Sequence, residues 1–67
     1  QDWNILLALT HYSRACTAGN AAAPERVTRL EAWIETTAKI GDGSSLELQA
    51  QMAQSSVPAA KTACGLQ

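Results

Sequence analysis

The feature that most constrains this chain is its pair of cysteines, Cys16 and Cys64, which stand far apart in only 67 residues. At this length a hydrophobic core alone gives marginal stability. A crosslink that closes a loop of about 50 residues contributes about 4 kcal/mol in the chain-entropy model. We therefore expect a Cys16–Cys64 disulfide, with two buried reduced thiols as the alternative. A zinc or redox site would need closely spaced cysteines or nearby partners, and His11 is the only histidine.

A disulfide places a protein in an oxidising compartment, so we expect the periplasm or the extracellular space. The chain starts with Gln1 rather than Met, as we expect for a processed or trimmed product. No apolar run approaches the roughly 20 residues that span a bilayer. Five basic residues are scattered among six acidic ones, for a net charge of −1. This charge distribution offers no patch for a phosphate backbone, so we expect no nucleic-acid partner.

The composition favours helices around a thin core. The chain has no Phe, and much of its 46% hydrophobic content is Ala. Alanine has the highest helix propensity but buries little apolar area. We therefore predict one all-α domain over residues 1–67, a small bundle of three to four short helices closed by one disulfide.

Apolar spacing predicts the first two helices. The first runs over about 2–18, is capped by Asp2 or Asn4, and ends at Gly19. The second begins near Pro24 and is stopped by Gly41. The residues expected to face the core are Ile5, Leu9, Tyr12 and Cys16 in the first helix, and Val27, Leu30, Ile34 and Ala38 in the second.

Two further signals predict the C-terminal half. Ser44 and Glu47 have the spacing of a capping box, which opens a third helix. Pro58 disfavours helical geometry at Val57, so we expect a kink or break there, followed by a short last helix. The residues expected on the core face of this half are Leu46, Ala50, Ala53, Val57, Ala60 and Cys64.

Signals for catalysis are weak. His11 is the only side chain that titrates near neutral pH, and its neighbouring hydroxyls do not make a triad. The chain also lacks hydrolase and phosphate-binding motifs. We therefore expect no enzyme activity, no metal and no cofactor, with a metal carrier that uses His11 as a minor alternative.

Several apolar side chains lie off the predicted core faces. Either they fill a bundle whose helices are buried on wide faces, or they form a groove for a partner helix. Such a groove binds apolar side chains that recur on the partner at helical spacing. The small size of the protein favours the first interpretation, while the enrichment of tryptophan at interface hot spots gives some support to the second. The candidate partner-binding residues are Trp3, Leu7, Trp33, Ile40, Leu48 and Met52.

Two segments, ILLALTHYSRAC near the start and SSVPAAKTAC near the end, resemble the small helical pilotins of type II secretion systems, which serve the outer-membrane secretin. The resemblance implies a disulfide between the first and last helices, with Cys16 and Cys64 as the matching cysteines. It also implies a groove that captures a helical segment at the secretin C-terminus. Pilotins usually carry an acylated N-terminal Cys, whereas this chain begins Gln1–Asp2. The resemblance therefore leaves open whether a lipid anchor has been lost from the N-terminus.

These observations predict a non-enzymatic periplasmic adaptor that binds a helix or tail of an envelope protein, such as a secretion component. One alternative is a periplasmic inhibitor or immunity protein, for which the turn at 41–43 is the candidate protrusion. Another is a stress chaperone that exposes apolar surface at low pH.

Overall fold

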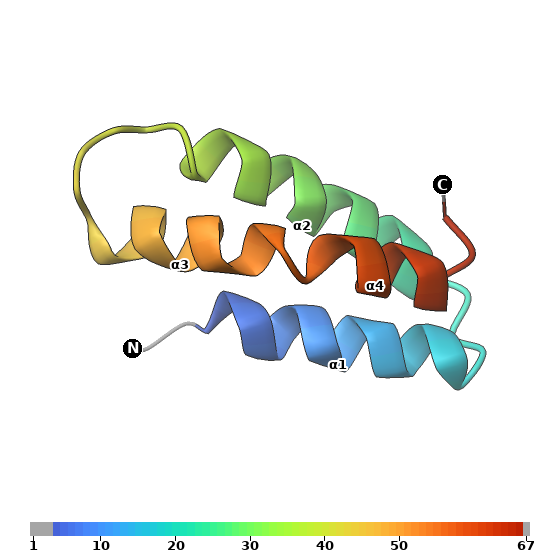
Figure 1. Ribbon diagram of the computed structural model, residues 1–67. Coiled ribbons are helices and arrows are strands. Elements are labelled where there is room, and N and C mark those ends of the chain that lie inside the picture. The colour runs from blue at the N-terminus through green and yellow to red at the C-terminus, as the bar shows by residue number, and fades with distance from the viewer. Residues whose placement is uncertain (1–3, 67) are drawn as a thin grey trace.

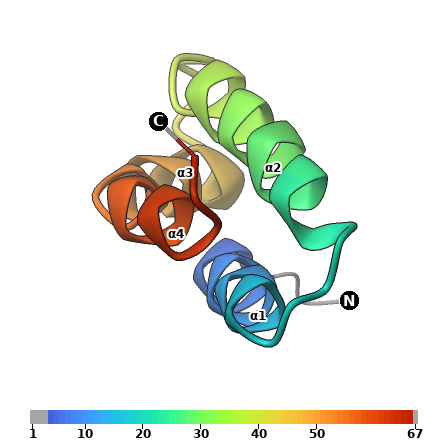
Figure 2. The same cartoon turned by 90° about the vertical axis from the view of Figure 1, so that its right-hand side faces the viewer.

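Four α-helices follow one another in the computed structural model, which describes residues 4–66. They are α1 (Ile5–Thr17), α2 (Ala23–Thr37), α3 (Ser45–Gln54) and α4 (Val57–Ala63). α2 runs back along α1, and α3 and α4 follow end to end as a third rod (Figure 1). Seen from the end of the bundle, α1, α2 and the α3–α4 rod surround a common centre, and α2 is inclined to the other two (Figure 2). The predicted all-α bundle is confirmed.

Side chains and prolines fix the helix starts. Asn4, one of the two predicted caps, accepts a hydrogen bond from the Leu7 N–H at 3.1 Å. Ser44 caps α3 in the same way and accepts the Glu47 N–H at 3.1 Å. α2 and α4 instead have Pro24 and Pro58 in their first turns, where a missing N–H costs no intrahelical bond.

The end of α2 and the break before α4 differ from the prediction. α2 ends at Thr37 rather than near Gly41, because the N–H groups of Lys39 and Ile40 bond three residues back in a tighter turn. The third rod breaks at residues 55–56, just before Val57 rather than at it. Pro58 is tolerated in the first turn of a helix, so α4 can begin at Val57.

The core lies where the three rods meet. Its largest fully buried side chains are Ile5, Leu9, Val27 and Ile34. The third rod contributes mainly alanines to the core, and their small side chains let it approach α1 and α2 closely. Leu46 is the correction to the predicted core: it is 46% exposed, because the core cluster in α3 starts only at Ala50, one turn further on.

The third rod is also tied to the other two by specific bonds. A disulfide joins Cys16 to Cys64 with their Cα atoms 5.0 Å apart, and residues 4–66 contain no free cysteine. Lys61 of α4 forms an ion pair with Glu31 of α2, with Nζ 3.3 Å from Oε2. The predicted disulfide is thus confirmed in place of two reduced thiols. Within the described range, no helix is long and apolar enough to cross a membrane.

Candidate functional site

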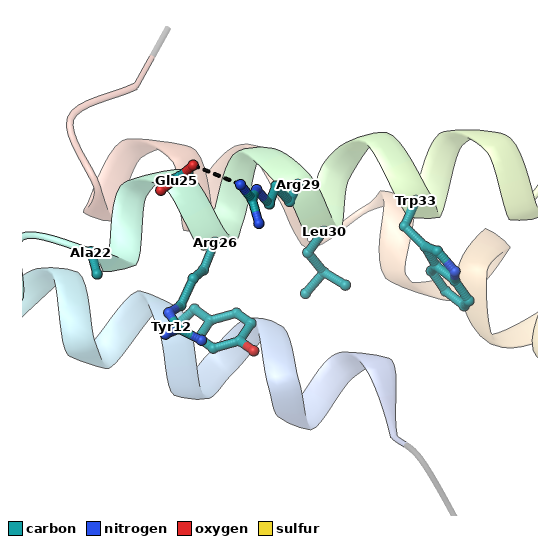
Figure 3. Close-up of a pocket in the computed structure, with 7 residues that line it drawn as sticks. All are labelled: Tyr12, Ala22, Glu25, Arg26, Arg29, Leu30 and Trp33. Atoms are coloured by element: carbon teal, nitrogen blue, oxygen red, sulfur yellow. Dashed lines mark hydrogen bonds and ion pairs between the residues drawn. The ribbon is translucent and has the colours of Figure 1, made fainter.

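An open groove of about 390 Å³ lies along the seam between α1 and α2. Its large apolar side chains are Tyr12 of α1 and Leu30 and Trp33 of α2, and Ala22 lines it just before α2 (Figure 3). Leu30 is buried, whereas Tyr12 and Trp33 are half-buried and pack against the core. The groove therefore has a fixed apolar floor with two aromatic side chains that are still partly open to solvent.

The helical repeat of α2 explains this lining. Arg26, Leu30 and Trp33 stand at positions i, i+4 and i+7, which fall on one side of a helix. Val27 and Ile34, each one position further along, are fully buried in the core. One side of α2 thus supports the bundle, while the adjacent side presents a charged position followed by two apolar positions.

The charges at the groove leave one cation unbalanced. Glu25 and Arg29 lie one turn apart on the exposed side of α2 and form an ion pair at 2.9 Å. Arg26 extends from α2 towards α1, where Tyr12 lies (Figure 3). Within residues 4–66, Arg26 has no carboxylate partner. The groove therefore has one net positive charge beside its apolar floor.

The structure scatters the predicted partner-binding residues over several surfaces. Trp33 lines the groove, but Leu7, 67% exposed on α1, does not. Ile40 is exposed just after the end of α2. Leu48 and Met52 are exposed one turn apart on α3, away from the groove. Trp3 lies outside the described residues.

The helical spacing of the apolar residues did not identify the groove residues other than Trp33. It assigned Tyr12 and Leu30 to the core face, and both do pack against the core, but both also line the groove. Arg26 was not singled out at all. The signal that could have found it is its i, i+4, i+7 relation to Leu30 and Trp33 on a single flank of the helix.

His11, the residue considered for metal binding, lies on the surface of α1. Its ring centre lies 6.1 Å from that of Tyr12. Across residues 4–66, no group of three His, Cys, Asp or Glu side chains is placed to hold a metal ion. The metal-carrier alternative thus gains no support from the geometry around His11.

The turn between α2 and α3 is held by its own carboxylates. Glu47 accepts hydrogen bonds from the N–H groups of Gly41 and Gly43. Asp42 accepts the Ser44 N–H at 2.9 Å. Hydrogen bonds from the Ser44 side chain, and secondly from its backbone N–H, hold the pKa of Asp42 below its ordinary value. These carboxylates order the loop, so they are already engaged within the chain.

The chain matches no protein-family model, no curated protein and no solved structure at a significant level. Its class therefore rests on its own geometry. The fold and the groove define a disulfide-linked all-α bundle with an open, partly apolar groove between two antiparallel helices.

Proposed function

We propose that this chain is a non-enzymatic adaptor that binds a helical segment of one protein partner in the groove between α1 and α2. The supporting observation is the apolar floor made by Tyr12, Leu30 and Trp33 on two helices that the core holds in place. Tyrosine and tryptophan in such positions are the usual energetic centres of protein interfaces. A fixed groove also limits the entropy lost when a partner binds.

The backbone of the groove favours a helix over an extended strand as the occupant. α1 and α2 use their backbone N–H and C=O groups within their own helices, so the groove walls offer no ladder for a strand. A partner segment must then satisfy its own backbone hydrogen bonds. An amphipathic helix does so and presents apolar anchors at helical spacing.

The compartment and the kind of partner belong to the same proposal. The Cys16–Cys64 disulfide supports a periplasmic or extracellular location. The partial resemblance to secretin pilotins supports an envelope protein, such as a secretion component, as the owner of the bound helix. The inhibitor alternative is less favoured, because the 41–43 turn already uses Glu47 and Asp42 for its own hydrogen bonds.

The test is site-specific photo-crosslinking in a native envelope fraction. A photoreactive side chain replaces Arg29 at the rim of the groove or, as the matched control, Met52 on the exposed face of α3. We expect position 29 to crosslink to one defined segment of one protein, and position 52 not to do so. The mapped segment, made as a peptide, should be helical when bound.

Binding of that peptide is then compared between variants. Trp33→Ala should weaken it about tenfold or more, as at an interface hot spot, whereas Leu7→Asp should leave it unchanged. Trp33→Ala should also lower the unfolding midpoint, because Trp33 packs against the core. Circular dichroism must therefore show that both variants remain helical and fully folded at the temperature of the binding measurement. Crosslinks to an extended or disordered segment, or binding that ignores Trp33, would contradict the proposal.

A further inference from the structure

The geometry of the groove points to the chemistry of its occupant. We infer that the bound helix carries an Asp or Glu side chain that pairs with Arg26, one turn from a first apolar anchor and two turns from a second. This inference rests on the proposed function of the groove and specifies what that groove selects.

The spacing follows from the register of α2. At a rise of about 1.5 Å per residue, Leu30 lies about 6 Å from Arg26 along the helix axis, and Trp33 lies about 10 Å from it. A partner helix that lies along α2 has the same rise. Its matching side chains therefore recur at four and seven residues from the acidic one, in either chain direction.

The sign of the charge follows from the ion pairs already made. The Arg29 guanidinium lies 2.9 Å from the Glu25 carboxylate, so its charge is already balanced within α2. Arg26 has no such neighbour among residues 4–66, and it extends along the wall of the groove beside Tyr12. A carboxylate is the group that a guanidinium binds best, through paired and charge-assisted hydrogen bonds.

The same cation selects against other helices. A lysine or arginine at the matching position would face Arg26 across a partly apolar groove, where like charges repel more strongly than in water. An apolar side chain there would cover Arg26 without satisfying its donors. Arg26 thus contributes specificity, while the half-buried Trp33 supplies most of the apolar contact area beside the buried Leu30.

The experiment selects ligands from a display library of helical peptides of about 16 residues, long enough to form a helix on their own. The oxidised full chain is immobilised and peptides that it retains are sequenced. We expect enriched peptides to carry one Asp or Glu, with one apolar residue four positions from it and a second apolar residue seven positions from it in the same direction. The same selection on Arg26→Glu should enrich Lys or Arg at that position instead.

Affinities of one enriched acidic peptide provide the quantitative check. Arg26→Glu should weaken its binding about fivefold and Arg26→Gln about twofold, as expected for a partly exposed ion pair. Arg14→Glu is the matched control, because Arg14 is exposed on α1 outside the groove. A Lys replacement of the acidic residue in the peptide should restore binding to Arg26→Glu.

The outcomes separate the two proposals. Peptides that need Trp33 but show no acidic preference, or bind Arg26→Glu equally well, overturn the inference and leave the groove as a docking site. If no peptide requires Trp33, the proposed function itself is overturned, and the inference with it.

Discussion

Cys16 in the last turn of α1 is bonded to Cys64, the residue that caps the C-terminus of α4. The C-terminal ends of α1 and α4 lie at the end of the bundle away from the α2–α3 loop (Figure 1). α4 has only 7 residues and contributes two buried side chains, Val57 and Ala60. A helix this short does not persist in water by itself. The disulfide therefore holds α4 where its few apolar contacts can form.

Loss of the disulfide should strongly destabilise the protein. Its two cysteines are 48 residues apart, and closing such a loop contributes about 4 kcal/mol in the chain-entropy model. We expect reduction, or Cys64→Ser, to lower the free energy of unfolding by about 3–4 kcal/mol in guanidinium titrations. Cys16→Ser combined with Cys64→Ser should cost no more than either change alone. A loss below about 1 kcal/mol would show that the bond adds little to the native state.

The buried and exposed apolar side chains should respond very differently to truncation. Ile34 is fully buried, so Ile34→Ala should cost about 3 kcal/mol through lost burial and a residual cavity. Leu7 is 67% exposed, so Leu7→Asp should change the free energy of unfolding by less than about 0.5 kcal/mol. Both values come from chemical unfolding of the oxidised protein. Unfolding of Leu7→Asp would instead place this side chain in the core.

Periodicity predicted the helices and most of the core because burial of a helix face is a local property of its sequence. Ile34 and Val27 follow directly from their spacing. The groove was harder to foresee, because it depends on how far apart two helices sit and how each is rotated. Those quantities depend on side chains of the third rod, such as Ala50 and Ala53, which are distant in sequence. Trp33 could therefore be placed on a flank, but Tyr12, predicted on the core face of the first helix, could not be recognised as part of the same groove.

The same limit applies to the capping box. The sequence predicted that Ser44 caps α3, and the structure confirms it. In a complete capping box the Glu47 side chain would return to the Ser44 N–H. The structure instead directs it to Gly41 and Gly43, while Asp42 takes the Ser44 N–H. The tight turn, which Gly41 enters at a φ of 77°, brings these N–H groups within reach.

Neutralising Glu47 should therefore loosen the α2–α3 turn. Its carboxylate accepts two backbone N–H groups, and charge-assisted bonds of this kind are stronger than neutral ones. We expect Glu47→Ala to cost about 1 kcal/mol and to speed hydrogen exchange at the amides of Gly41 and Gly43. Glu35→Ala, an exposed change on α2, is the control and should leave both exchange rates as they were. Unchanged exchange in Glu47→Ala would mean that the turn is ordered by its backbone alone.

Asp42 should titrate below its ordinary pKa of 3.8. The Ser44 side chain and the Ser44 N–H both favour the charged carboxylate, so the folded pKa lies under the unfolded one. This stabilisation is fully present above the unfolded pKa and is lost as the pH falls through the folded pKa. Carboxyl carbon chemical shifts followed by NMR report the pKa directly. Ser44→Ala should raise the pKa of Asp42 towards the ordinary value, and no rise would exclude Ser44 as the principal cause.

The ion pair between Glu31 and Lys61 should contribute more than the pair between Glu25 and Arg29. Glu31 and Lys61 join α2 to α4, and their side chains are only 23% and 26% exposed. Glu25 and Arg29 lie on one helix with side chains 68% and 78% exposed, where water and salt screen the attraction.

Double-mutant cycles measure both coupling energies under identical conditions. For Glu31→Gln with Lys61→Met we expect a coupling of about 1 kcal/mol that persists in high salt. For Glu25→Gln with Arg29→Met we expect about 0.3 kcal/mol, falling towards zero as salt is added. Equal couplings with equal salt dependence would mean that the α2–α4 contact is as open to water as the helix surface. α4 would then depend on the disulfide and on its two buried side chains alone.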